Sequence, residues 1–430
     1  MTHAKDRASA SPAHSPGQPT RPERSRPPGT TMAIDGPVVV LKPGREKSVL
    51  HRHPWLFSGG IDHVNGDPAS GETVTVVSAE GGFLCRAAYS PASQIRARAW
   101  SFDPGETVDA AWFERRVNTA VAARQSMLDG QHTACRLIHG EADGLPGVIA
   151  DRYGDTLVVQ FTAAGAEHWR ATIVQALLVA TGAQNAYERS DADVRSLEGL
   201  LARTGVVAGR VPDEVVMIEN GIRYRVDIVA GQKTGFFLDQ RENRAAVQNY
   251  AANRAVLNMF CYTGAFSLAA LSGGAASVLS IDSSTEALAL ARENLQRNPQ
   301  LPAERAQWRA ADAFQELRRL RDAGQQFDLV VLDPPKFAPT AHHAARAARA
   351  YKDINLWALK LLRPGGLLAT FSCSGGIDAA LFRKIIAGAA VDARAQCVVM
   401  RAFAASADHP VALAFPEGEY LKGLLLRRIA

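Results

Sequence analysis

An aspartate and a cysteine, about forty residues apart, stand where two apolar segments of the chain end. DLVVLDPPKF places Asp333 after one strand-like segment, and GLLATFSCSGG places Cys373 after the other. Ligands of open α/β sheets collect at the carboxyl ends of strands, so neighbouring strands would bring this carboxylate and this thiol into one pocket. A thiolate that adds to ring carbon 6 of a pyrimidine activates carbon 5, and a carboxylate can hold the base and balance the charge. The pair predicts methylation of a pyrimidine ring carbon, with Cys373 and Asp333 as catalytic residues.

The other cysteines fit this chemistry less well. Cys261 lies beside a glycine loop and is the rival nucleophile, but no Asp-Pro-Pro run accompanies it. Cys85, Cys135 and Cys397 lie inside apolar strand or linker patterns and are expected to be structural. Five scattered cysteines without a CxxC pair indicate a reducing compartment, and we expect a cytoplasmic protein.

The elements that would position the pair alternate between strand and helix. From about residue 226, the apolar runs AVLNMF, SVLSI, DLVVL and GLLATF are separated by helical stretches such as SSTEALALARENLQRN and AARAARAYKDINLWALKLL. Such alternation is typical of βαβ units and a parallel sheet, which makes the fold class α/β. Two further runs, VVMRAF and YLKGLLLRR, are expected to be closing strands.

The rest of the chain divides by composition. Residues 1–36 are rich in Pro, Ser, Ala and Arg and predict a disordered tail, with Met32 as a second candidate start. Residues 37–110 hold short apolar runs broken by Gly and Pro, which predict a β-rich module. Residues 111–225 combine a helical stretch with a Gly-Leu-Pro-Gly turn and apolar alternation, which predict an α+β domain with a hairpin, and 226–430 form the α/β domain. No signal-peptide core or long apolar run occurs, so no membrane partner is expected.

Three strand ends of the α/β domain carry residues that suit a nucleoside cofactor. Gly264 follows the first strand, Asp282 ends the second about twenty residues later, and Asp312 follows the third. A glycine admits close approach of a ligand, and an acid after the second strand can bind both ribose hydroxyls. Each aspartate alone is also explained as a helix cap or a loop acid, but the three in order favour a pocket. The second glycine expected for NAD and the GxxxxGK[ST] motif expected for ATP do not occur there.

This order resembles the class I S-adenosylmethionine-dependent methyltransferases. More specific strings look like the RlmI-type 23S ribosomal RNA (cytosine-5) methyltransferases: HPWLFSGG, RLIHGEADGLPGVIADRY, GQKTGFFLDQREN, NMFCYTGAFSL, LDPPKF, FSCSG and DHPVALAFPEGEYLKG. The resemblance covers nearly everything after the tail. It implies an N-terminal PUA RNA-binding domain, a central domain with a β-hairpin, a C-terminal Rossmann-like methyltransferase domain, S-adenosylmethionine as cofactor and ribosomal RNA as partner.

The resemblance also implies which residues line the cofactor cleft. Residues of the GQKTGFF segment would lie near the carboxylate and the amine of the cofactor's methionine part and near the edge of its adenine ring. The cleft would continue along the next residues, Asp239, Gln240 and Arg241. No metal is implied. The cofactor-binding residues carried over are Lys233, Thr234, Phe236, Phe260, Tyr262, Thr263, Gly264, Ala265, Phe266, Asp282, Ser283, Asp312, Ala313 and Asp333.

The positions of the cysteines in two motifs indicate how many thiols the reaction uses. FSCSG also resembles the 5-methyluridine RNA methyltransferases, which use one cysteine at this strand. Two-cysteine 5-methylcytosine enzymes carry Pro-Cys where this chain has Lys336, so a single-cysteine mechanism is expected. Lys336 suits an RNA phosphate contact or simple solvation. The base that removes the carbon 5 proton stays open, with Glu417 and Glu419 as candidates against the alternative of loop acids.

The net charge of the chain says little about its partner, and other functions compete with the methylation of a ring carbon. The net charge of +5 is compatible with RNA but favours it only slightly, and Arg86, Arg96 and Arg98 are the candidate phosphate contacts of the β-rich module. The oligomeric state stays open, with a homodimer among the possibilities. A guanine-nitrogen methyltransferase would leave Cys373 idle. A non-catalytic RNA-binding scaffold would not need three acids at strand ends, and a small-molecule methyltransferase would not explain the β-rich module.

Overall fold

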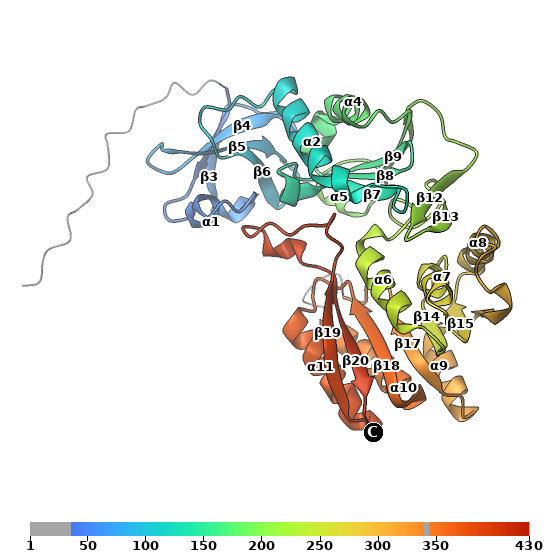
Figure 1. The fold of residues 1–430 in the computed structure, drawn as a ribbon. Coiled ribbons are helices and arrows are strands. Elements are labelled where there is room, and N and C mark those ends of the chain that lie inside the picture. Colours follow the sequence, from blue (N-terminus) through green and yellow to red (C-terminus); the bar gives the residue numbers. More distant parts are fainter. Residues whose placement is uncertain (1–35, 339–343, 430) are drawn as a thin grey trace, which may run out of the picture.

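The computed structural model describes residues 36–338 and 344–429, which form four sheets. Two β-rich parts occupy the upper half of Figure 1, and an α/β part that contains the C-terminus lies below them. The expected tail, apart from Gly36, lies outside the described residues. Within the described ranges, no helix is both long and apolar enough to cross a bilayer. The domain boundaries expected from the sequence stay predictions.

The first sheet is built from short strands in the order β2-β6-β5-β4-β1-β3. Cys85 is fully buried in its core together with Val39 and Val76, which agrees with a structural role for this thiol. The short helix α1 (Lys47–Leu50) follows the first strand. The strands are β1 (Val38–Leu41), β2 (Trp55–Phe57), β3 (Ile61–Asn65), β4 (Thr73–Val77), β5 (Phe83–Tyr89) and β6 (Ile95–Ser101).

The second sheet has the order β11-β10-β9-β8-β7 and packs against α2 and α4 through an apolar core that includes Trp112 and Phe113. Its predicted hairpin is β8-β9, which turns at Gly154 and Asp155 because Tyr153 pairs with Thr156. The Gly-Leu-Pro-Gly turn lies instead between β7 and β8, which are also antiparallel. The elements are α2 (Ala110–Arg124), β7 (Ala134–His139), β8 (Val148–Tyr153), β9 (Thr156–Phe161), α3 (Ala164–His168), α4 (Arg170–Thr181), β10 (Asn185–Ser190), α5 (Val194–Leu197) and β11 (Arg203–Ala208).

The α/β part contains the sheet β16-β15-β14-β17-β18-β20-β19, in which β14 to β18 run parallel and β20 is antiparallel to both neighbours. All of the strands expected from the apolar runs form. They are β14 (Ala255–Met259), β15 (Ser277–Asp282), β16 (Ala306–Ala310), β17 (Phe327–Leu332), β18 (Leu362–Ser372), β19 (Cys397–Ala404) and β20 (Lys422–Arg428).

Both faces of this sheet are covered, which explains why its central strands are apolar without alternation. Leu329 and Val331 of β17 enter one core with residues of α6 and α7, whereas Val330 and Leu332 enter the other with residues of α9 to α11. The helices are α6 (Arg241–Tyr250), α7 (Ala265–Ser272), α8 (Thr285–Gln296), α9 (Ala313–Asp322), α10 (Ala344–Leu361) and α11 (Ala379–Ala393). The carboxyl ends of the parallel strands therefore meet at one edge, where the candidate site residues follow them.

A long connection between β19 and β20, residues 405–421, is here named the strap. In Figure 1 this red segment runs from the α/β sheet to the β-rich parts above it. Phe415 of the strap packs against Trp55 with the ring centroids 4.7 Å apart, and Glu417 accepts a hydrogen bond from His53 at 3.2 Å. Trp55 in turn donates to Glu141 at 2.8 Å, so the first sheet, the second sheet and the strap meet at one junction.

A buried ion pair joins the hairpin β12 (Val215–Glu219) and β13 (Ile222–Val226) to the α/β part. Arg244 of α6 donates from Nε and Nη2 to the two carboxylate oxygens of Glu219, at 2.5 and 2.7 Å. Its third donor group, Nη1, bonds the carbonyl of Phe237 at 2.9 Å. Both side chains are almost completely buried. The pair thus anchors the segment between β13 and α6, which reaches the candidate site.

Removal of one partner should cost more than an ordinary ion pair is worth. We expect Arg244→Met to lower the free energy of unfolding by about 3–5 kcal/mol, because Glu219 is left charged in the interior with the more distant Arg241 Nε, 4.0 Å away, as its counter-charge. Denaturant midpoints would measure the loss, and Arg244→Met combined with Glu219→Gln should recover most of it. Arg225→Met is the control, since its pair with Glu293 is exposed and should contribute less than about 1 kcal/mol. Equal losses in the two single variants would contradict the structural role of the buried pair.

Candidate active site

The loop after β14 has a strained backbone. Phe260, Tyr262 and Gly264 have φ angles of 59°, 47° and 82°, all in the left-handed region that side chains other than glycine rarely adopt. Such residues persist only where their surroundings hold them, and they gather at functional sites. A Cβ on Gly264 would come within 2.8 Å of Trp308 and 3.0 Å of Ala291. Close packing of the loop against β16 and α8 therefore requires this glycine, in addition to any ligand.

Asp282 is oriented by the same loop. Its Oδ2 accepts from the Tyr262 N–H at 2.8 Å, and its Oδ1 accepts from the Ser284 N–H at 2.9 Å. A carboxylate has about four acceptor positions, so lone pairs remain for a ligand. Ser283 beside it is exposed.

Asp312 lies at the N-terminus of α9 and accepts from the Gln315 N–H at 2.9 Å. This is the helix-cap arrangement that the sequence left open. Ala313 is buried at the first helical position. The side chains after the glycine loop are likewise inward: Phe266 is buried against Phe371, with ring centroids 5.5 Å apart.

The segment between β13 and α6 lies against the glycine loop. The Tyr262 hydroxyl accepts from the Gln232 N–H at 3.0 Å, and the Tyr262 ring packs edge-on against Phe237. Thr234 is fully buried and donates to Asp151 at 2.6 Å, so its hydroxyl already has a partner in the second sheet. Phe236 is also buried, beneath the guanidinium of Arg244. Both residues hold the segment in place, and any cofactor contact of theirs stays a prediction.

Lys233 differs from its neighbours, because its charge acts on both candidate catalytic residues, Asp333 and Cys373. Its backbone is left-handed, with a φ angle of 53°, and its ammonium lies 3.6 Å from Asp239 Oδ2. The ammonium also lies over the rings of Phe237 and Tyr420. Burial would raise the pKa of Asp239, but Lys233 and the Tyr420 hydroxyl, 2.6 Å away, help to hold that pKa well below its usual range.

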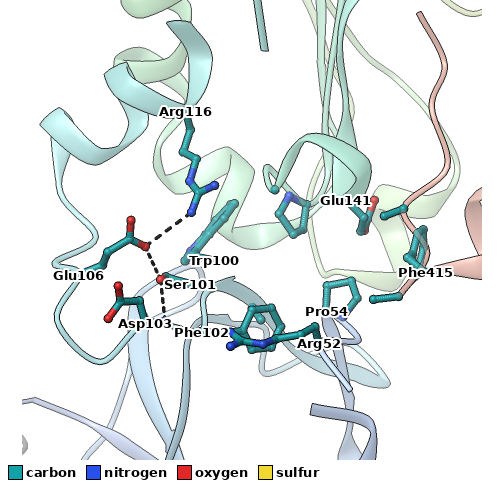
Figure 2. A pocket seen from close by; sticks show the side chains of 15 residues that line it. Arg52, Pro54, Trp100, Ser101, Phe102, Asp103, Glu106, Arg116, Glu141 and Phe415 are labelled. Carbon is teal, nitrogen blue, oxygen red and sulfur yellow. Dashed lines mark hydrogen bonds and ion pairs between the residues drawn. The ribbon is translucent and has the colours of Figure 1, made fainter. Parts of the chain in front are cut away.

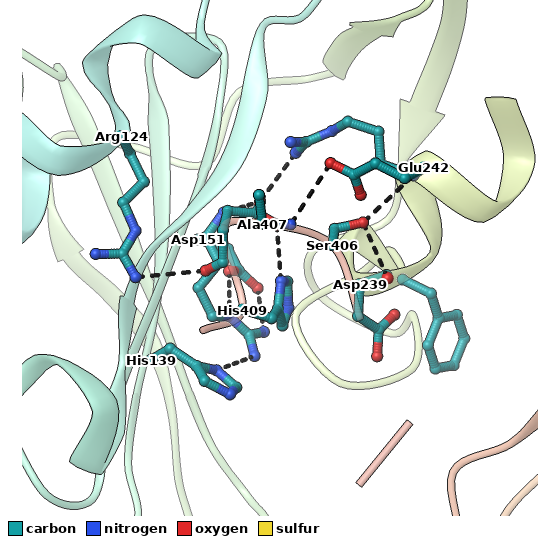
Figure 3. A network of polar contacts seen from close by, with 12 residues as sticks. Arg124, His139, Asp151, Asp239, Glu242, Ser406, Ala407 and His409 are labelled. Carbon is teal, nitrogen blue, oxygen red and sulfur yellow. Dashed lines mark hydrogen bonds and ion pairs between the residues drawn. The ribbon is translucent and has the colours of Figure 1, made fainter. Parts of the chain in front are cut away.

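A polar network fixes Asp239 from the side of the strap. Figure 3 shows Ser406, whose N–H and hydroxyl both donate to the Asp239 carbonyl, at 2.9 and 3.0 Å. Asp408 then accepts from Arg241 at 2.9 Å and from the Arg136 N–H at 2.9 Å. The network therefore connects the strap, the second sheet and the start of α6.

Asp333 and Cys373 follow adjacent parallel strands, β17 and β18; Leu332 at the end of β17 pairs with Thr370, and β18 continues for two more residues before Cys373. Gln240 donates to Asp333 Oδ1 at 2.9 Å, and Asn243 fixes the Gln240 amide by donating to its oxygen at 2.6 Å. Burial and then the charge of Asp239 raise the pKa of Asp333 to about 7. Burial raises the pKa of the Cys373 thiol, and the charge of Asp333 raises it further. The structure thus brings the predicted pair within electrostatic reach of each other.

The turn that carries Cys373 is held by hydroxyl groups. Ser372 donates to the Tyr351 hydroxyl at 2.9 Å, and that hydroxyl lies 3.0 Å from Ser374 Oγ. Ser374 Oγ also accepts from the Ala338 N–H at 3.0 Å, which ties the turn to the segment after Asp-Pro-Pro. Tyr351 was not predicted as a site residue, because α10 gave only an amphipathic signal.

The remaining cysteines are less suited to act as nucleophiles. Cys261 is buried, and its pKa is raised well above the usual value by burial and by the charge of Asp282. Cys85 and Cys135 are fully buried, and Cys397 is half-buried on the edge strand β19. Cys373 is the half-buried cysteine at a parallel strand end beside a carboxylate.

The two candidate bases and the candidate RNA contacts lie elsewhere. Glu417 bonds His53 near a cavity of about 370 Å³, which Figure 2 shows between Trp100, Phe102 and Phe415. Glu419 is exposed on the strap.

Among the arginines expected to bind phosphate, Arg98 is buried in an ion pair with Glu198 at 2.9 Å, so that expectation is wrong for Arg98. Arg86 donates to Thr75, and Arg96 donates to the carbonyl of Pro91. Within the part of the chain that the structure describes, no three His, Cys, Asp or Glu side chains gather as metal ligands would.

Comparisons with known proteins agree with this architecture. Residues 202–399 match a family model described as S-adenosylmethionine-dependent methyltransferase, and residues 39–102 match a PUA-like domain. A protein of Shewanella frigidimarina named ribosomal RNA large subunit methyltransferase I is 49% identical over 392 residues, which cover 90% of this chain and 98% of the relative. A protein of the same name from Tolumonas auensis is 48% identical over 394 residues, which cover 91% and 99%.

Solved structures share the fold. A SAM-dependent methyltransferase from Streptococcus mutans superposes with a TM-score of 0.77 at 23% identity, over 91% of this chain and 99% of that chain. A methyltransferase complexed with SAH superposes with a TM-score of 0.79 at 24% identity, over the same shares of the two chains.

The raised pKa of Asp333 predicts a specific dependence of stability on pH. Ionised Asp333 destabilises the folded state, so wild-type protein should lose stability relative to Asp333→Asn as pH rises from the usual value of 3.8 to about 7. We expect a relative loss of about 1–3 kcal/mol after screening by solvent, measured by denaturant midpoints at several pH values.

Asp328→Asn is the matched control, because Arg363 and the Ala255 N–H hold the pKa of Asp328 below its usual range despite burial. The difference in unfolding free energy between Asp328→Asn and wild type should stay constant between about pH 5 and pH 8. If the stability difference between wild type and Asp333→Asn also stays constant over this pH range, the pKa of Asp333 is not raised.

Proposed function

The chain belongs to the family of ribosomal RNA large subunit methyltransferase I, and from that premise we propose that it methylates carbon 5 of a cytosine in ribosomal RNA of the large subunit through a covalent adduct at Cys373. It is an S-adenosylmethionine-dependent ribosomal RNA methyltransferase with an N-terminal PUA-like domain. The choice of carbon 5 and of cytosine rests on the chemistry of the site. A ribosomal substrate would place the enzyme in the cytoplasm.

One observation carries the proposal. Cys373 and Asp333 follow adjacent parallel strands, and the charge of Asp333 raises the pKa of the Cys373 thiol. Transfer of a methyl group to nitrogen needs no thiol, whereas carbon 5 of a pyrimidine becomes nucleophilic only after a nucleophile has added to carbon 6. A thiol held beside a carboxyl group that can carry a proton at neutral pH supports the carbon 5 reaction.

The cofactor residues support S-adenosylmethionine at the ends of β14 and β15. Thr263 Oγ1 is buried without a hydrogen-bond partner among the described residues, so it is free for a ligand. Asp282 is oriented by two N–H groups and retains lone pairs for the ribose hydroxyls. When bound, the cofactor supplies an electrophilic methyl group on a sulfonium centre.

The chain's own residues would act on the cytosine in order. The Cys373 thiolate forms a bond from Sγ to carbon 6, and the electrons of the carbon 5–carbon 6 double bond move towards nitrogen 3. Protonated Asp333 donates its proton to nitrogen 3, which its pKa of about 7 permits near neutral pH. Carbon 5 of the resulting enamine is then nucleophilic enough to accept a methyl group.

The adduct must afterwards collapse. A base removes the proton from carbon 5, the Sγ–carbon 6 bond breaks, and nitrogen 3 returns its proton to Asp333. Glu417 and Glu419 remain candidate bases, although Glu417 bonds His53 in the absence of RNA. RNA contacts of the N-terminal module, apart from the buried Arg98, remain part of the proposal.

The covalent adduct can be tested directly. Cys373→Ala should reduce methylation of ribosomal RNA by about 10⁴-fold or more, as loss of a covalent nucleophile does, while cofactor binding is retained. RNA with 5-fluorocytosine at the target should trap the wild-type protein, because fluorine cannot leave as the proton does.

Cys397→Ala is the control, since this half-buried thiol lies on the edge strand, and it should methylate at the normal rate. Full activity of Cys373→Ala without any adduct would reject the mechanism and favour transfer to a guanine nitrogen, whereas an adduct mapped to Cys261 would show that Cys373 is not the nucleophile.

A further inference from the structure

A buried lysine lies under the turn that carries Cys373. Lys422 is the first residue of β20 and pairs in register with Ser372 of β18, the residue before the cysteine. Its side chain is almost completely buried. The ammonium donates to the carbonyl of Ser374 at 2.9 Å and to the carbonyl of Ile377 at 2.5 Å. The lysine thus binds the turn on the C-terminal side of Cys373, whereas Tyr351 binds the serines on both sides of it, Ser372 and Ser374.

We propose that Lys422 is a positioning residue for the reaction, which holds the 373–377 turn through these two carbonyl groups and serves as the fixed buried counter-charge of the Cys373 thiolate. This role rests on the proposed function of Cys373 as nucleophile. It assigns to β20 a part in catalysis that neither the strand-end pattern nor the glycine loop indicates.

The surroundings of Cys373 explain why a counter-charge is needed. Burial disfavours the thiolate, and the carboxylates of Asp333 and Asp239 disfavour it further. A thiolate is nonetheless the reacting form, so positive charge must offset these effects. The charged and titratable groups that act on Cys373, or on which it acts, are Lys233 and Asp239 before α6, Asp333 and Lys336 after β17, Tyr351 on α10, Tyr420 at the end of the strap and Lys422 at the start of β20.

Three of these groups are lysines, and they differ in how firmly they are held. Lys336 is exposed, and the side chain of Lys233 is 46% exposed and paired with Asp239. Both can move when RNA binds. Lys422 is buried and held by two backbone carbonyls, so its charge stays at the turn. Burial lowers the pKa of Lys422, and the Cys373 thiolate raises it, as expected if the two charges stabilise each other.

The acidity of the Cys373 thiol tests this role without RNA or methyl transfer. The rate at which iodoacetamide alkylates Cys373 in the full-length protein follows the thiolate fraction, and peptide mass spectrometry separates this product from those of other cysteines. We expect Lys422→Met to raise the midpoint of the pH profile by about one unit, which slows alkylation near neutral pH about tenfold. Lys422→Arg keeps the charge and should keep a midpoint close to that of wild type.

Two further variants separate charge from geometry. Lys422→Gln retains N–H donors for the carbonyls and removes the charge, so it should shift the midpoint as Lys422→Met does, and it serves if Lys422→Met does not fold. Tyr351→Phe loosens the same turn without a change of charge and should leave the midpoint unchanged. An unchanged midpoint in the two charge-removing variants, or an equal shift in Tyr351→Phe, would overturn the proposal.

The role of Lys422 and the proposed function of Cys373 can be rejected separately. If wild-type protein forms the 5-fluorocytosine adduct but Lys422→Gln keeps a normal thiol midpoint, Cys373 is the nucleophile and Lys422 is not its counter-charge. If the midpoint shifts but no adduct forms, Lys422 does control the thiol, and the carbon 5 mechanism is wrong.

Discussion

The site depends on a conflict between two acidic groups that share one buried place. The charge of Asp333 disfavours the Cys373 thiolate, the charge of Asp239 disfavours ionisation of Asp333, and burial disfavours the charged form of both groups. In the proposed mechanism, a carboxyl group that keeps its proton near neutral pH donates it to a ring nitrogen, and the thiolate requires positive charge nearby. The rest of the site stabilises this arrangement: the Gln240 amide orients Asp333, hydroxyl groups hold the Cys373 turn, and lysines offset the negative charge.

The fold places these groups by register and by the strap. Parallel pairing of β17 with β18 brings the carboxylate and the thiol to one edge, and antiparallel β20 adds a side chain from the opposite direction. The strap contacts His53 and Trp55 of the first sheet before it reaches Tyr420 and Lys422. One short stretch of chain therefore contacts the N-terminal module and leads directly into the residues beside the Cys373 turn.

Sequence reasoning succeeded where the signal was local. Continuous apolar runs gave the strands of the α/β sheet, and the structure places Asp333, Cys373 and Asp282 at or after the ends of these strands as expected, while their functional roles stay predictions. It failed where contacts join distant residues: Gln240 to Asp333, Tyr351 to the cysteine turn, and Lys422 to the same turn. No spacing rule connects such positions, because tertiary packing alone brings them together.

The reasons for individual residues also differed from the sequence interpretation. Gly264 was explained by close approach of a ligand, but its missing side chain also makes room for Trp308 and Ala291. Thr234 and Phe236 were assigned to the cofactor, yet their side chains serve buried contacts with Asp151 and Arg244.

Nucleoside mass spectrometry of large-subunit ribosomal RNA, from cells with and without this protein, tests the central claim most directly. The account predicts the loss of 5-methylcytidine at one position, whereas the loss of a methylated guanosine with 5-methylcytidine unchanged would contradict it.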